Sequence, residues 1–319
     1  MNNQLFINKI NLIVFLFCCS LFLWSNYLNQ YITPLVSLFI ILILGTSHGA
    51  LDNYKGSILI KHYRIKNIFN FYFIYLLISI IFFSLWFYIP SVLIIFLLVA
   101  SYHFGKEDSE ILKHDASISY RIIYFIKGSL IVFAPLYFQF KETLYLFELI
   151  NLDAKYLYFL KNNNLIDSIF YISIFSNLYF LRKFNFLNLK IICLDISSII
   201  LLFYFLSPLV AFTFYFCFIH SLRHIVSLAN LLSPNDLKSG LNTFIKKAMP
   251  LTLLTALIFV CAVIYSSQYY SANESIIKVI FIGLASLTFP HILLEYLLKK
   301  NEKYFKNIIS FSSWLLCGC

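Results

Sequence analysis

Long apolar segments separated by short polar segments run along almost the whole chain. A membrane-spanning helix needs about 17–25 mostly apolar residues, and ten segments reach or approach that length. They are Ile10–Leu28, Thr33–Leu51, Ile68–Ile89, Ser91–Phe104, Tyr120–Phe138, Leu165–Leu181, Ile191–Leu206, Pro208–Leu231, Met249–Ser267 and Ser275–Leu298. Outer-membrane barrels would instead show short segments of alternating polarity. The pattern predicts an all-α polytopic bundle of about ten spans, forming one transmembrane domain over residues 1–319.

The composition excludes a soluble or a disordered protein. Hydrophobic residues make up 61% of the chain and charged residues 12%, whereas soluble domains carry about 25% charged residues. A formal net charge of +10 is compatible with nucleic-acid binding, but no aromatic and basic reading module is visible. We therefore expect the chain to lie in membrane lipid and to bind no nucleic acid.

The basic residues predict the orientation of the bundle. With the N-terminus in the cytoplasm, 17 of the 24 Lys and Arg residues fall in cytoplasmic segments, 3 fall on the opposite side and 4 lie within spans. Cytoplasmic loops of membrane proteins carry such an excess of basic residues. A cytoplasmic N-terminus is the prediction.

Five of the seven histidines lie in or at the end of apolar segments: His48, His103, His220, His224 and His291. All five belong to even-numbered spans, towards the cytoplasmic end of each, so we expect them to share one layer of the membrane. Ionisable residues inside membrane spans are costly and usually functional. The other two histidines, at 62 and 114, lie in polar loops and need no special role.

His220 and His224 are four residues apart, a spacing that places both on one face of a helix with Cβ atoms about 5–6 Å apart. Such a pair either chelates a transition metal or is held by ordinary hydrogen bonds. His48 and His103 at the same depth favour a metal, because imidazole suits Zn, Cu, Fe and Ni.

Three carboxylates follow these histidines by four or five residues: Asp52, Asp108 and Glu295. A metal-bound imidazole usually donates its other N–H to a carboxylate or a carbonyl, and these acids could accept it. Alternatively, they are solvated at the membrane boundary. Arg223, between the paired histidines, could bind Asp195 or Asp52, or it could face the far side of its helix.

Four motifs in this order resemble the Brp/Blh family of membrane β-carotene 15,15′-dioxygenases: GTSHGALD (Gly45–Asp52), SYHFGKED (Ser101–Asp108), HSLRH (His220–His224) and FPHILLE (Phe289–Glu295). The resemblance implies an Fe(II) cofactor held by four histidines: His48, His103, His220 and His224. It places His291 near the substrate or in the outer shell of the site. The first motif departs from the family pattern at Thr46 and Ser47, where we expect a proline before the histidine.

The resemblance also implies a reaction and a location. The central double bond of β-carotene would be cleaved with O₂ to give two molecules of all-trans-retinal, which would pass to a microbial rhodopsin. The location would be a bacterial inner membrane. Aromatic residues make up 19% of the chain, and a dense aromatic interior suits a long, flat, apolar substrate.

Other functions remain open at this point. Another membrane metal-dependent oxidase of lipids or carotenoids would use the same histidines. Two-iron desaturases need about eight histidines in clustered boxes, more than the five candidates here. A metal-coupled or proton-coupled transporter would use the histidine layer as its site and would show inverted repeats.

Overall fold

The computed structural model describes residues 3–65, 67–89, 91–109, 118–180, 186–234 and 236–300, and within these ranges every regular element is a helix. In chain order they are α1 (Asn3–Leu23), α2 (Ser25–Tyr31), α3 (Pro34–Ile40), the π-helix η1 (Ile41–Gly45), the 3-10 helix η2 (Thr46–Leu51), α4 (Asp52–His62), α5 (Ile68–Tyr88), α6 (Val92–Glu107), α7 (Ile118–Phe138), α8 (Phe140–Leu149), α9 (Ala154–Asn162), α10 (Leu165–Phe180), α11 (Phe186–Phe205), α12 (Pro208–Phe214), the π-helix η5 (Tyr215–Ser221), α13 (Leu222–Leu232), α14 (Leu237–Ser266) and α15 (Ala272–Lys300).

Several helices begin directly after a residue whose short polar side chain caps the first turn. Thr33 accepts a hydrogen bond from the Val36 N–H, and Asn67 and Asp236 accept bonds from N–H groups two residues further on. Such caps satisfy backbone N–H groups that the first turn of a helix leaves without partners. Pro34 opens α3, a position where a proline costs no hydrogen bond.

The number of spans is smaller than the sequence pattern predicts. Among the described residues, five helices are long and apolar enough to cross a membrane, and two bent helix pairs raise the number to seven. One of these pairs is α1 and α2, which meet at an angle of 81°. The predicted spans at 165–181 and 191–206 form apolar helices of only 10–17 residues in their described parts. The all-helical membrane bundle is confirmed, but about ten spans are not.

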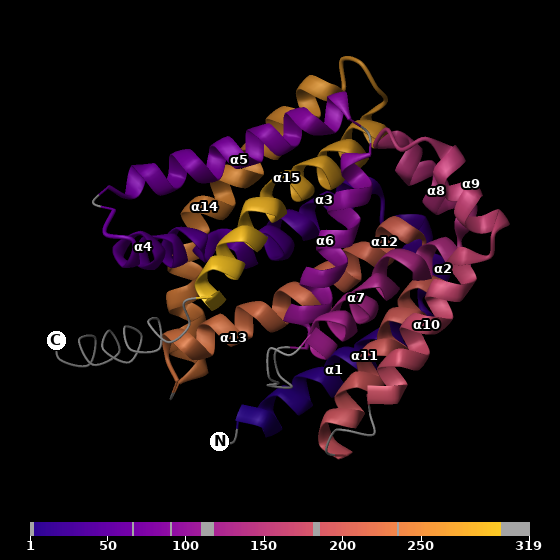
Figure 1. The fold of residues 1–319 in the computed structure, drawn as a ribbon, viewed down its shortest axis with the longest axis horizontal. Coiled ribbons are helices and arrows are strands. Elements are labelled where there is room, and N and C mark those ends of the chain that lie inside the picture. The colour runs from indigo at the N-terminus through magenta and orange to yellow at the C-terminus, as the bar shows by residue number, and fades with distance from the viewer. Residues whose placement is uncertain are drawn as a thin grey trace.

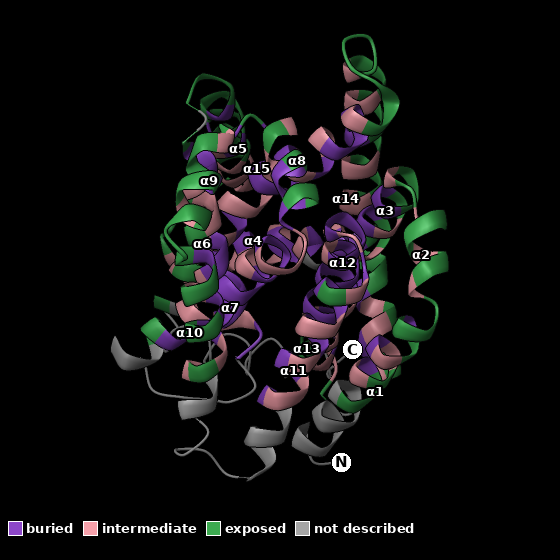
Figure 2. Cartoon of the chain, turned by 90° about the vertical axis from the view of Figure 1, so that its right-hand side faces the viewer, coloured by how far each residue is buried: buried purple, intermediate pink, exposed green. Residues whose placement is uncertain are grey.

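The bundle has a buried centre and an apolar exterior. Helices α7, α10, α11 and α1 pack along one side, and α5, α14 and α15 along another (Figure 1). Only 17% of the apolar window in Ile68–Tyr88 is buried, against 67% in Pro208–Leu232. The buried residues gather on the central helices, while the outer helices are largely exposed (Figure 2). Exposed residues of α5 include Phe69, Phe73 and Ile80, as expected for a surface that faces lipid.

Two glycines set the contact between α6 and α7, which positions the histidine of the second motif. A Cβ atom on Gly105 would lie 1.8 Å from the carbonyl oxygen of Tyr124, and a Cβ atom on Gly128 would lie 1.7 Å from that of Ser101. The two backbones can approach this closely only because neither residue has a side chain. His103, two residues before Gly105, is therefore held deep in the bundle.

Candidate metal centre

Four histidine rings form a row across the centre of the bundle. His103 of α6 has its ring centroid 5.6 Å from that of His220 in η5 and 5.5 Å from that of His291 in α15. The ring of His291 lies 6.2 Å from that of His224 in α13. His103, His220 and His291 are each less than 5% exposed. Histidines that are far apart in the sequence thus meet in one place, as the shared membrane depth predicts.

His48 occupies the 3-10 helix η2, and its side chain lies outside what the structure describes. The backbone of η2 nevertheless borders the row, because a Cβ atom on Gly49 would lie 4.0 Å from Nδ1 of His291. The loop histidine at position 114 also lies outside the described residues.

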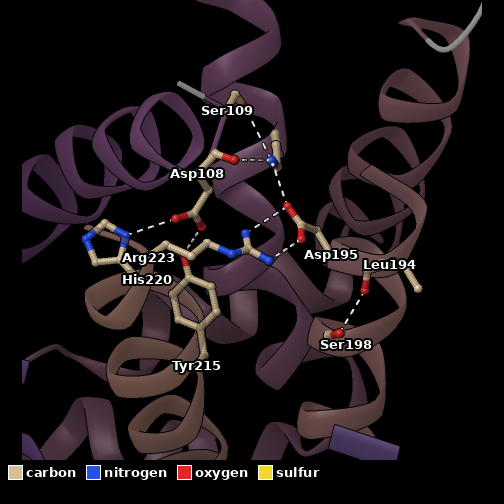
Figure 3. Close-up of polar contacts among 9 residues, drawn as sticks. Asp108, Ser109, Leu194, Asp195, Ser198, Tyr215, His220 and Arg223 are labelled. Atoms are coloured by element: carbon tan, nitrogen blue, oxygen red, sulfur yellow. Dashed lines mark hydrogen bonds and ion pairs between the residues drawn. The ribbon is translucent and has the colours of Figure 1, made fainter. Parts of the chain in front are cut away.

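Two aspartates bind histidines of other helices. Asp108 accepts a hydrogen bond from Nδ1 of His220 at 3.0 Å (Figure 3). Asp52 lies 2.8 and 2.9 Å from Nδ1 of His291 through its two oxygens. Each aspartate follows a different histidine in the sequence, so proximity along the chain does not identify its partner. When a carboxylate holds Nδ1, Nε2 is the nitrogen that can coordinate a metal.

The third predicted carboxylate has a different role. Glu295 forms an ion pair with Lys55 of α4, and the Lys55 ammonium lies 3.3 Å from Nε2 of His224. Nδ1 of His224 lies 3.8 Å from Glu107. His224 therefore has a charged environment of its own, which the sequence motifs do not predict.

A network of ion pairs lies behind His220. Arg223 binds both oxygens of Asp195, at 3.0 and 2.5 Å, which decides among the partners that the sequence leaves open (Figure 3). Lys127 donates to Asp195 at 3.3 Å and to the backbone oxygen of Asp108 at 3.2 Å. These pairs link α7, α11 and α13 to the candidate site.

Two tyrosines complete the contacts of the aspartates. The Tyr215 hydroxyl donates to Asp108 at 2.7 Å, and the Tyr75 hydroxyl donates to Asp52 at 2.9 Å. The sequence analysis missed both tyrosines, together with Lys55 and Glu107. Tyr75 has no motif around it. Tyr215 precedes His220 by five residues, and in an α-helix the two side chains would point in different directions.

The charges of this cluster match a divalent cation. The cluster contains five carboxylates and three cations: Asp52, Glu107, Asp108, Asp195, Glu295, Lys55, Lys127 and Arg223. None of these side chains is more than 13% exposed. With neutral imidazoles, two negative charges are left over, and burying such charges is costly unless they are compensated.

The donor set therefore fits a metal ion of charge +2, with imidazoles as ligands and carboxylates behind them. In the described part of the chain, which leaves out the His48 side chain, no three His, Cys, Asp or Glu side chains already have the spacing of a metal site. The described rings would have to move closer together around an ion.

An apolar cavity with a volume of about 100 Å³ adjoins the histidine row at the His220 end. Its walls come from α5, α6, α7, α8, α11, α12, η5 and α15. Phe104 and Phe216 line it, and their rings lie 4.8 and 5.9 Å from the ring of His220. Its lining is almost entirely apolar, which is the polarity expected of a pocket that takes an apolar molecule.

Helices α8 and α9 form the segment between the apolar segments at 120–138 and 165–181. Thr143, Leu146 and Phe147 of α8 line the end of the cavity, while Tyr145 on the same helix is exposed. The segment is thus part of the cavity wall as well as of the surface.

The fold and these contacts define an integral membrane protein with a buried histidine cluster beside an apolar cavity. The model of the β-carotene 15,15′-dioxygenase family matches residues 39–299. This chain belongs to the β-carotene 15,15′-dioxygenase family. A curated relative with the name β-carotene 15,15′-dioxygenase, from the uncultured marine bacterium 66A03, is 28% identical over 280 residues, covering 85% of this chain and 96% of the relative. No solved structure matches the chain.

Proposed function

We propose that this chain is an Fe(II)-dependent dioxygenase that cleaves the central 15,15′ double bond of β-carotene with O₂ and releases two molecules of all-trans-retinal. The observation that carries the proposal is the contact between the buried histidine row and the apolar cavity, through Phe104 and Phe216. Family membership and the name of the relative support the same reaction.

His48, His103, His220 and His224 would hold the iron. His291 belongs to the same site, because its ring lies between those of His103 and His224 and Asp52 holds its Nδ1. The bound iron would supply the chemistry that activates O₂ for oxidative cleavage.

The residues of the chain would bind, orient and shield the substrate. Apolar and aromatic side chains from eight helical elements line the cavity, so the polyene would be held in a nearly water-free environment. The phenyl rings of Phe104 and Phe216 would lie between the polyene and His220 and would place the double bond by contact. Excluding water also protects reactive oxygen species from side reactions.

The location follows from the composition of the surface and the positions of the basic residues. β-Carotene dissolves in the membrane, so the substrate would reach the cavity from the lipid. We propose a bacterial inner membrane, a cytoplasmic N-terminus, one transmembrane domain over residues 1–319, and transfer of retinal to a microbial rhodopsin.

The decisive experiment is expression of the full chain in a bacterium that accumulates β-carotene, with chromatography of the extracted pigments. Retinal should appear as β-carotene disappears. Activity of the purified chain should be lost after chelation and should return with Fe(II), and ¹⁸O₂ should label the retinal. Unchanged β-carotene in the presence of inserted, iron-loaded protein would contradict the proposed substrate.

The second candidate function is metal transport, and its test is whether the chain moves a metal ion across a membrane. Uptake of Fe(II) or Zn(II) into vesicles that contain the chain, without retinal formation from β-carotene, would favour that function. The charged neighbours of His224 are the feature that a transporter would explain.

A further inference from the structure

Two tyrosines outside every motif, Tyr215 buried and Tyr75 half-buried, contact the candidate centre in the same way. Tyr215 donates to one oxygen of Asp108, whose other oxygen holds Nδ1 of His220 (Figure 3). Tyr75 donates to Asp52, which holds Nδ1 of His291. Both contacts have the order tyrosine, aspartate, histidine, although the first set of residues and the second set come from different helices.

The π-helix η5 is what makes the first arrangement possible. Tyr215 and His220 are five residues apart. In an α-helix with 3.6 residues per turn, residues five apart point in directions roughly 140° apart. The wider turn of a π-helix, with its i→i+5 hydrogen bonds, brings them close to alignment. Asp108 can therefore meet both side chains, one with each oxygen.

We infer that Tyr215 and Tyr75 are positioning residues of the metal site. Each hydroxyl fixes the rotation of a carboxylate, and the carboxylate then fixes the tautomer and the ring orientation of its histidine. A hydroxyl bound to the carboxylate also moderates the negative charge that the imidazole feels. The inference rests on the proposed function, because it assumes that these histidines hold iron.

The two tyrosines differ in how firmly they are held. Tyr215 is fully buried and bonds to Asp108 at 2.7 Å. Tyr75 bonds to Asp52 at 2.9 Å and also lies 3.3 Å from the backbone oxygen of Leu287. We therefore expect Tyr215 to have the larger influence on the site.

The experiment compares Tyr215→Phe, Tyr75→Phe and Tyr171→Phe in the purified full chain. Tyr171 is the matched control, because its hydroxyl bonds to that of Tyr137 at 2.7 Å on an exposed face. The measurements are the Kd for Fe(II), by competition with a chelator, and the visible absorption spectrum of the Co(II)-substituted protein. Thermal unfolding of the metal-free proteins reports whether each variant is folded.

Loss of an outer partner of a metal ligand typically costs about 10–100-fold in affinity. We expect Tyr215→Phe to weaken Fe(II) binding by about tenfold, at the lower end of that range, and to shift the Co(II) bands. Tyr75→Phe should have a smaller effect in the same direction, and Tyr171→Phe should match the unmodified chain. Adding Tyr215→Phe to Asp108→Asn should change little further, since the tyrosine acts through Asp108.

Wild-type Fe(II) affinity and an unchanged Co(II) spectrum in both Tyr215→Phe and Tyr75→Phe would overturn the inference alone. An unmodified chain that binds no Fe(II) would overturn the proposed function as well. If Tyr215→Phe does not fold, Tyr75→Phe carries the same test at the other aspartate.

Discussion

The two ends of the histidine row differ in what surrounds them. His220 lies against the apolar cavity, with Phe104 and Phe216 on its ring, and a single carboxylate holds its Nδ1. His224, at the opposite end, lies between an ammonium group and a carboxylate, those of Lys55 and Glu107. At one end apolar rings of the cavity wall lie on the histidine, whereas at the other end charged groups flank both of its ring nitrogens.

This difference indicates separate tasks for the two ends. A carotenoid in the cavity would lie against the His220 end, so the double bond to be cleaved would lie near His220 and His103. The Lys55–Glu295 ion pair makes the surroundings of His224 unfavourable for an apolar molecule. The predictions below test this division, from the largest expected effect to the smallest.

The largest effect is expected from His220→Ala. The substitution removes a ring that contacts both His103 and the cavity wall, so it should abolish retinal formation and lower the iron content of the purified chain. His62→Ala is the control, because His62 lies at the end of α4 and outside the row. Retinal formation by His220→Ala at the rate of the unmodified chain would contradict the ligand assignment.

The second largest effect is expected on the Fe(II) Kd when either aspartate is replaced, and the test compares Asp108→Asn with Asp52→Asn. Asparagine has one acceptor oxygen, whereas Asp108 uses one oxygen for His220 and the other for Tyr215. In Asp52, Oδ2 lies within hydrogen-bond distance of both His291 and Tyr75, and Oδ1 also lies 2.9 Å from His291 Nδ1, so one remaining acceptor oxygen can keep both contacts. Within the range of about 10–100-fold for outer partners, the Fe(II) Kd should rise towards the upper end for Asp108→Asn and towards the lower end for Asp52→Asn. Equal values would remove the predicted difference between the two aspartates.

A smaller effect is expected when the cavity is filled. Leu97→Trp should slow retinal formation by roughly tenfold or more, because a displaced substrate loses reactivity steeply, while the iron content stays unchanged. Ile95→Trp is the matched control, since Ile95 is on the same helix but 57% exposed, whereas Leu97 lines the cavity. Iron content and steady-state rates with β-carotene in detergent measure both properties. Full activity of Leu97→Trp would place the substrate elsewhere.

The smallest effect on iron binding is expected at the charged end. Lys55→Met removes the ammonium beside Nε2 of His224 and should strengthen Fe(II) binding by a few-fold. It should also destabilise the metal-free protein, because losing one partner of a buried ion pair costs about 3–5 kcal/mol. Thermal unfolding should show the loss, and adding Glu295→Gln should restore part of it. Weaker Fe(II) binding by Lys55→Met would show that Lys55 supports the metal site.

The sequence analysis succeeds where the membrane environment dictates the outcome. Buried histidines in apolar segments are costly, so their shared depth predicts the row of His103, His220, His224 and His291 that the structure shows. The number of spans is the weaker prediction, because an apolar segment of given length can form a full span, a short buried helix or one arm of a bent pair.

The pairing of the carboxylates could not be predicted from their spacing. Asp52 and Asp108 follow His48 and His103 in the sequence, yet they hold His291 and His220. Asp108 and His220 come together because glycines let α6 approach α7 closely and because η5 departs from α-helical geometry. Neither effect can be recognised from apolar positions that repeat every 3.6 residues along the sequence.

By itself, the sequence determined the membrane class, the helical architecture and the histidines that gather in the described row, because the cost of placing polar groups in lipid depends on composition and apolar length. Only the tertiary structure decided which acid serves which imidazole, where Tyr75 and Tyr215 act, and which end of the row meets the cavity. Those outcomes depend on distances of about 3 Å between side chains of different helices, and such distances arise only when the helices pack.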